Sequence, residues 1–136
     1  VESLMRLSYT MHGSDGAVEV IGQGIPHPRN YGTFPRIIAR YVREKRIISL
    51  EEAIRKMTSF PAQTLRLKER GMIREGNYAD ITIFDWNTFE DKATFSVPHQ
   101  YSQGLIYVLV NGELVVDKGK HTARLPGMIL YGKGKE

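Results

Sequence analysis

The spacing of the apolar residues changes at Gly71, and this change constrains the fold more than any other feature of the chain. Before Gly71, apolar residues recur at three- and four-residue intervals, which is typical of helices. After it, they gather in short runs bounded by glycine, asparagine and aspartate, which is typical of strands. The sequence therefore predicts an α/β protein with a mainly helical first part, residues 1–70, and a β part, residues 71–136.

Three helices are predicted before Gly71. The first begins at Thr33, whose hydroxyl can cap it, has Pro35 in its first turn and runs for about 12 residues. The second begins at the capping box Ser49-Leu50-Glu51-Glu52, and the third is short, from Ser59 to about Leu67. Their predicted core-facing residues are Phe34, Ile37, Ile38, Tyr41, Val42, Ala53, Ile54 and Met57.

Three strands are predicted after Gly71, at 79–84, 105–110 and 113–116. Asn111-Gly112 joins the last two, and this pair is a strong hairpin signal because both turn residues must adopt positive φ. A polar connection with several aromatic residues, residues 86–104, separates the first two strands. Beyond Gly119 we expect irregular chain.

The opening segment, Leu4 to Met11, shows partial alternation and is predicted to be a strand. Gly13-Ser14-Asp15-Gly16 follows it directly. If the strand is buried, Asp15 lies at its C-terminal mouth, where α/β barrels place their active sites. The alternative is that Asp15 is a turn residue whose carboxylate bonds the backbone two residues on.

Residues 12–33 form a loop much longer than the usual connection between a strand and a helix. Pro26 and Pro28 stiffen it around His27 and Arg29. This loop is a candidate binding element. The alternative is that His27 only packs and Arg29 pairs with a surface acid.

Composition excludes several function classes. The 136 residues, 41% of them hydrophobic, suffice for one domain. A net charge of +4 without a long basic run argues against nucleic-acid binding. The absence of cysteine excludes disulfides and cysteine-based metal sites in this chain, and no apolar run has the length of a membrane span. We expect a cytoplasmic protein, and because the chain opens on Val1 we expect it to be a piece of something longer.

Two stretches carry a family resemblance. Residues 48–67 followed by 71–85 resemble the C-terminal signature of the amidohydrolase superfamily, and the hairpin at 110–116 is similar to its next element. Gly13-Ser14-Asp15-Gly16, His27-Pro28-Arg29, and the runs 31–36 and 40–44 resemble the N-acyl-D-amino-acid deacylase (D-aminoacylase) branch. The resemblance implies that residues 1–70 are the last strand and helices of a (β/α)8 barrel. It also implies that residues 71–136 are C-terminal strands of a small composite β-sandwich, so that the chain is incomplete as a stand-alone fold.

The resemblance implies zinc-dependent hydrolysis of the amide bond of N-acyl-D-amino acids. Asp15 would lie against the metal and act as the catalytic acid and base, Arg29 would bind the substrate's α-carboxylate, and His27 would shape the substrate-binding loop. The four histidines contain no His-x-His pair, so most zinc ligands would come from the N-terminal remainder of the enzyme. Two alternatives remain. One is another amidohydrolase, such as a dihydroorotase- or hydantoinase-type cyclic amidase, which would lack the His27-Pro28-Arg29 loop. The other is a non-catalytic structural or interaction remnant of the fold.

Overall fold

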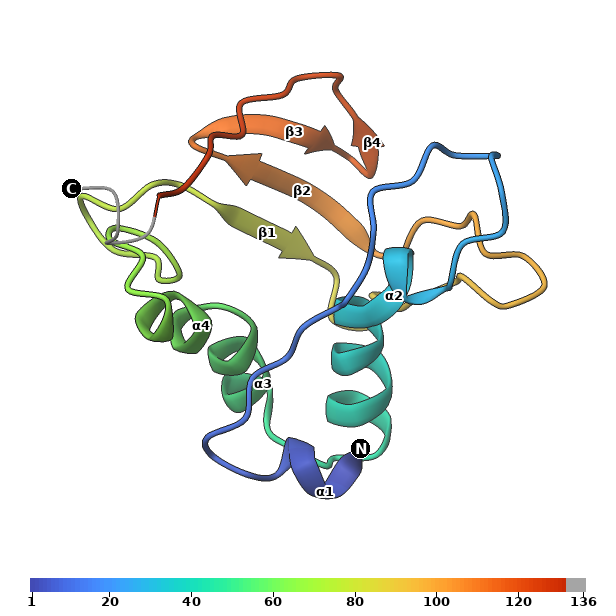
Figure 1. Cartoon of the computed structure of the whole chain (residues 1–136), viewed down its shortest axis with the longest axis horizontal. Coiled ribbons are helices and arrows are strands. Elements are labelled where there is room, and N and C mark those ends of the chain that lie inside the picture. The colour runs from blue at the N-terminus through green and yellow to red at the C-terminus, as the bar shows by residue number, and fades with distance from the viewer. Residues whose placement is uncertain (132–136) are drawn as a thin grey trace.

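Helices fill one side of the molecule and a small antiparallel sheet fills the other (Figure 1). The computed structural model describes residues 1–131. The helical elements are α1 (Glu2–Met5), α2 (Arg29–Arg36), η1 (Ile37–Glu44), α3 (Leu50–Met57) and α4 (Ser59–Thr64). The strands are β1 (Ile81–Phe84), β2 (Leu105–Val110), β3 (Glu113–Asp117) and β4 (Lys120–His121). The predicted α/β class, with helices preceding the sheet, is confirmed.

The opening segment is not a strand, so this part of the prediction is wrong. Residues 2–5 form α1, and the chain then turns so that the Thr10 hydroxyl donates to the carbonyls of Leu4 (2.8 Å) and Leu7 (3.0 Å). The ammonium of Lys56 on α3 donates to the carbonyls of Met5 (2.8 Å) and Leu7 as well. In a strand these carbonyl groups would accept hydrogen bonds from a neighbouring strand. Here they accept from the side chains of Thr10 and Lys56 instead.

Helix α2 begins four residues before the predicted start. Pro28 occupies the N-cap with φ −52°, and the Thr33 hydroxyl donates to the carbonyl of Arg29 (3.0 Å) instead of capping a helix. Pro35 therefore lies inside α2, where it has no N–H for the helix ladder. The helix continues as η1, a π-helix that closes with a bond from the amide of Lys45 to the carbonyl of Arg40 (2.9 Å).

The second and third helices agree with the sequence. The Ser49 hydroxyl accepts the amide of Glu52 (3.2 Å), so the predicted cap of α3 is confirmed. Helix α4 begins at Ser59 as predicted and ends at Thr64, three residues before the predicted end.

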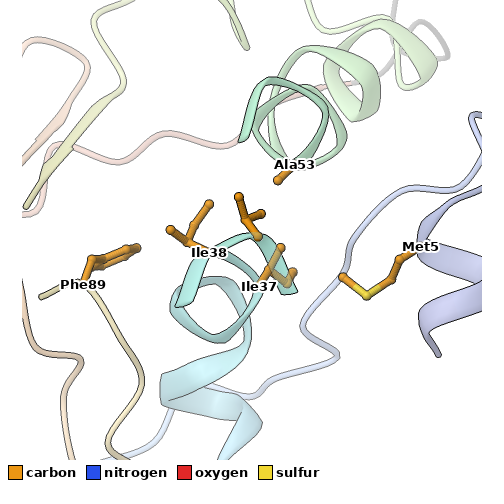
Figure 2. Close-up of a cluster of buried hydrophobic side chains, with 6 residues drawn as sticks. Met5, Ile37, Ile38, Ala53 and Phe89 are labelled. Atoms are coloured by element: carbon orange, nitrogen blue, oxygen red, sulfur yellow. The ribbon is translucent and has the colours of Figure 1, made fainter. Parts of the chain in front are cut away.

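The core lies where α1, η1, α3 and the chain after β1 meet (Figure 2). Ile37 and Ile38 of η1 contribute side chains that are 6% and 1% exposed, and Ala53 of α3 is fully buried beside them. Met5 and Phe89 close the cluster from α1 and from the β1–β2 connection. Burying a side chain of this size contributes about 1.5 to 3 kcal/mol to stability, so this cluster is what fixes η1 against α3.

The sheet is an antiparallel meander in the order β1-β2-β3-β4. Asn111 (φ 50°) and Gly112 (φ 83°) form the turn between β2 and β3, which confirms the hairpin predicted from the sequence. Strand β4 was not predicted, because irregular chain was expected beyond Gly119. Lys118 (φ 48°) and Gly119 (φ 77°) make a second tight turn that lets Lys120 pair with Asp117. None of the helices described in residues 1–131 combines the length and the apolarity that a membrane span requires.

Candidate functional site

Asp15 and Arg29, two residues nominated from the sequence, form an ion pair. The carboxylate of Asp15 lies 2.9 Å from the guanidinium of Arg29, with side chains 85% and 45% exposed. Asp15 has φ 48°, in the left-handed region that an aspartate tolerates better than most residues. Arg29 is the first residue of α2, so a rigid helix sets where its side chain begins. The ion pair thus joins the first part of the long loop, residues 12–28, to the helix that follows the loop.

The turn at Asp15 is closed by its neighbour. The Ser14 hydroxyl accepts the amide of Gly16 (3.2 Å), which is the role that the alternative interpretation assigned to Asp15. A Cβ at Gly16 would lie 3.2 Å from the Cα of Asn30, so a larger residue here would require the backbone at Asn30 to shift by a few tenths of an ångström. The carboxylate of Asp15 is thereby left to face Arg29 and solvent.

His27, the third nominated residue, belongs to the same cluster. Its Nδ1 accepts the amide of Arg29 (3.0 Å), which orders the backbone just before α2. Its ring packs edge-on against Phe95 of the β1–β2 connection, with centroids 5.0 Å apart. Both contacts are structural, and they support the view that His27 shapes the loop.

Asn30 holds the first part of the long loop. Its side-chain oxygen accepts the amide of Ala17 (3.2 Å), and its side-chain nitrogen donates to the carboxylate of Glu19 (3.0 Å). Asn30 follows Arg29 directly, so the first turn of α2 binds the long loop at two points, residues 17 and 19. Sequence reasoning did not single out Asn30.

The long loop forms one wall of the site, and the β1–β2 connection, residues 86–104, forms the other. Sequence reasoning missed this role of the connection. In Figure 1 it lies beside the long loop at the end of α2. The ring of His99 contacts the hydroxyl of Tyr31 (2.9 Å) and the carbonyl of Gln23 (3.0 Å). The ring of Tyr31 also packs edge-on against the ring of Tyr101, with centroids 5.8 Å apart. Burial is the largest cause that raises the pKa of Tyr31, so its hydroxyl keeps its proton at neutral pH.

The connection is itself fixed to the helix that carries Arg29. Arg36 makes a paired contact with Asp91, with Nε 2.9 Å and Nη2 2.6 Å from one carboxylate oxygen. Gly32 lies so close to Asp91 that a Cβ would come within 2.8 Å of the aspartate Cβ. Farther along, Arg43 donates to the carbonyls of Trp86 (2.7 Å) and Phe89 (3.1 Å). The helix from α2 through η1 therefore supports both walls.

The described residues do not form a metal site by themselves. In the part of the chain that the structure describes, no three side chains of the His, Cys, Asp or Glu type are grouped to hold an ion. Asp15 supplies one exposed carboxylate, which can serve as a single ligand or as a base but cannot complete the three protein ligands of a catalytic zinc site. His12 is not part of this cluster, since its Nε2 is buried without a partner beneath the helices. Burial, and then the charge of Lys56, lower its pKa.

Comparisons with known proteins find a family match and two kinds of relative, a deacylase and a dihydroorotase. Residues 8–116 match the amidohydrolase family. An N-acyl-D-aspartate deacylase of Alcaligenes xylosoxydans xylosoxydans is 48% identical over 105 residues, covering 77% of this chain and 21% of the relative. A dihydroorotase of Endomicrobium trichonymphae is 30% identical over 62% of this chain.

Solved structures give the same result. A D-aminoacylase solved to define the role of its binuclear metal centre superposes with a TM-score of 0.84 at 38% identity, covering 90% of this chain and 25% of the other. An N-acyl-D-glutamate deacylase of Bordetella bronchiseptica, in complex with zinc and a phosphonate mimic of the tetrahedral intermediate, superposes with a TM-score of 0.76 at 40% identity, covering 84% of this chain and 23% of the other. The chain thus spans about a quarter or less of the length of these relatives.

Proposed function

Because the chain belongs to the amidohydrolase family, we propose that it is the C-terminal portion of a zinc-dependent enzyme that hydrolyses N-acyl-D-amino acids to a carboxylate and a D-amino acid. Residues 1–70 would contribute the last helices of a (β/α)8 barrel, and residues 71–136 would contribute strands of a small β-sandwich. The quarter-length match to the relatives and the incomplete set of metal ligands support this assignment.

Asp15 would be the catalytic base. An exposed carboxylate on a fixed turn is available to take a proton from the attacking water and to pass it to the nitrogen of the leaving amine. Zinc, held mostly by side chains outside this chain, would polarise the amide carbonyl as a Lewis acid.

Arg29 would hold the α-carboxylate of the substrate. Its guanidinium is a planar fork that matches a carboxylate in two-pronged fashion, and it is 45% exposed at the head of α2. In the structure this fork is paired with Asp15. An entering carboxylate would compete for the same guanidinium and so release Asp15 for proton transfer.

The observation that carries the proposal is this pairing of a base with a carboxylate-binding cation 2.9 Å apart. An N-acyl amino acid presents its amide nitrogen and its carboxylate on the same carbon, so it needs both groups close together. A cyclic amidase of the dihydroorotase type remains the second candidate, because dihydroorotases also match part of this chain.

The test is Asp15→Asn in the full-length protein, with Asp117→Asn at the exposed end of β3 as the matched control. The amide keeps the shape of the carboxylate but cannot accept a proton, so turnover of N-acyl-D-amino acids should fall by about 10² to 10⁴-fold. Zinc content should change little and the control should stay active.

Three results would decide against this proposal in different ways. Hydrolysis of dihydroorotate but of no N-acyl-D-amino acid would favour the cyclic amidase. Absence of all amidase activity in the wild type would favour a non-catalytic remnant. Near wild-type turnover in Asp15→Asn would leave Asp15 as an ordinary turn residue.

A further inference from the structure

His99 joins the two walls of the site through both nitrogens of its ring. Nε2 lies 3.0 Å from the carbonyl of Gln23 and 3.3 Å from that of Gly24, while Nδ1 lies 2.9 Å from the hydroxyl of Tyr31. Carbonyl oxygens only accept, so Nε2 carries the hydrogen. In the neutral ring, Nδ1 is then the acceptor for the protonated hydroxyl of Tyr31. The contacts therefore select one tautomer of His99.

The long loop has little packing of its own to hold its tip. Val18 and Ile25 are 102% and 85% exposed, so these apolar side chains contribute no core. Asn30 holds the loop near its start, at Ala17 and Glu19. Past that point, the described contacts to segments distant in the sequence come from the β1–β2 connection, through His99 to residues 23 and 24 and through Phe95 to His27.

His99 is itself held firmly. The side chain of Gln100 donates to the carbonyls of Lys92 and Val97, both at 2.8 Å, which closes the connection around His99. Asp91 ties the same connection to Arg36 on α2. Contacts thus run in a closed ring from α2 through the connection and the long loop back to Arg29, the first residue of α2.

We propose that His99 is a positioning residue that holds the tip of the long loop and thereby fixes Arg29 for substrate binding. The expected change in KM rests on the proposed function, whereas the expected change in loop exchange rests on the described contacts alone. His99 does not touch Arg29, and it acts on Arg29 through residues 23–28.

The test compares His99→Gln with His99→Asn in the full-length protein. Glutamine can place an amide nitrogen near the position of Nε2 and keep the donation to Gln23 and Gly24, whereas asparagine is too short to reach these carbonyls. His121→Gln on the exposed strand β4 is the matched control. Amide hydrogen exchange of residues 17–28, read by mass spectrometry, reports how firmly the loop is held.

His99→Asn should speed exchange in residues 17–28 about five- to tenfold, the size expected when a hydrogen bond worth about 1 kcal/mol is lost. KM for substrates with a free α-carboxylate should rise by a similar factor while kcat changes less than about twofold. His99→Gln and the control should resemble the wild type. The ring-nitrogen chemical shifts of His99 in the wild type should report the Nε2–H tautomer, which needs no variant to fold.

Several outcomes would overturn the proposal. These are the opposite tautomer, unchanged loop exchange in His99→Asn, equal loosening by the glutamine and asparagine variants, and a loosened loop with unchanged KM. If the wild type hydrolyses no N-acyl-D-amino acid, the proposed function fails, but the exchange rates and the tautomer still decide whether His99 holds the loop.

Discussion

Arg29 is the residue at which the sequence-based interpretations meet the structure most directly. One interpretation assigned it to a substrate carboxylate and the other to a surface acid. The acid it pairs with is Asp15, the nominated base, so the structure shows the pairing with an acid, and binding of a substrate carboxylate stays a prediction. The side chains of Arg29 and Asp15 are 45% and 85% exposed, so their ion pair contributes little to stability. Its release by a competing carboxylate would therefore cost little.

Arg29→Lys should therefore discriminate between substrates. Lysine keeps the charge but lacks the planar fork, so kcat/KM for N-acyl-D-amino acids with a free α-carboxylate should fall about ten- to hundredfold. The amidated analogues never make that contact and should be little affected. Steady-state kinetics on matched acid and amide substrates measures the difference, and equal losses on both would mean that Arg29 only supports the loop.

His12 gives the stability of the chain a pH dependence. Its pKa in the folded chain is lowered from 6.5, first by burial and then by the charge of Lys56. As the pH falls below about 6.5, the unfolded chain takes up this proton before the folded chain does. The stability that comes from keeping His12 neutral is thus fully retained above about pH 6.5. It is lost as the pH falls toward the pKa of His12 in the folded chain.

His12→Gln should reduce this acid loss. Urea denaturation at about pH 7.5 and about pH 5 should show a smaller drop in the free energy of unfolding for His12→Gln than for the wild type. His121→Gln, at an exposed histidine, should show the same drop as the wild type. Identical drops in all three proteins would contradict a pKa lowered by burial.

At the scale of elements, Lys56 links α3 to the turn after α1. Its side chain is fully buried, and its ammonium donates to the carbonyl of Met5 (2.8 Å), the carbonyl of Leu7 and the hydroxyl of Thr10 (3.0 Å). Three donors thus meet three acceptors, which is how a buried charge is tolerated. Together with Arg55, which donates to the carbonyl of Ser8 (2.8 Å), Lys56 holds the turn after α1 against α3.

Lys56→Met should destabilise the fold by roughly 1 to 3 kcal/mol, because it leaves the buried carbonyl of Met5 without a donor, whereas the carbonyl of Leu7 keeps the hydroxyl of Thr10. The decrease would appear in the midpoint of urea denaturation. Lys92→Met is the control, since Lys92 is exposed and its pair with Glu90 lies at the surface, where such pairs contribute at most about 1 kcal/mol. Comparable losses from the two variants would show that Lys56 does not organise the turn.

Two local signals in the sequence predicted their elements, whereas a third, the helix cap expected at Thr33, was wrong. The cap at Ser49 depends on a residue three positions away, and the turn at Asn111-Gly112 depends on the two residues themselves. Elements whose form depends on distant residues were missed. The segment after α1 is shaped by Lys56, 46 to 51 positions away, so its alternating pattern misled.

The residues of the candidate site likewise fall into two groups, those marked by the local sequence and those whose role depends on distant residues. Asp15, His27 and Arg29 were found because glycines and prolines mark their loop, and the structure brings all three together. His99 gave no such signal, since its partners Gln23 and Tyr31 lie 76 and 68 positions away. A sequence read alone cannot show that the connection returns to the long loop, because that depends on how the sheet docks on the helices.

At the scale of the whole molecule, the chain exposes more surface than a compact protein of its mass. Its accessible surface is 9551 Å², whereas a compact monomer of 15.5 kDa is expected to expose about 7200 Å². Strand β2 shows the cause, because all six of its residues are only half-buried although five of them are apolar. This excess agrees with a segment that spans about a quarter of its relatives.

The isolated 136-residue chain should bind zinc no better than a surface-histidine control. One carboxylate without clustered histidines cannot supply three protein ligands, and the described residues group no such set. Metal analysis after dialysis, compared with the variant His121→Gln, checks this expectation. One tightly held zinc per chain would overturn the proposal that most ligands lie outside it.

The contacts of His99 also impose an order in time. A bond that joins residues 76 positions apart cannot form until the intervening chain has been made, and the entropic cost of closing so long a loop favours its formation after other contacts exist. During synthesis, α2 and the long loop emerge well before the β1–β2 connection that holds the tip. The site would therefore mature last, after the sheet has docked, and a growing chain would carry Arg29 and Asp15 without yet presenting them in working geometry. Pulse-labelled amide exchange during refolding should show residues 17–28 gaining protection after β1 and β2, and earlier protection would refute this order.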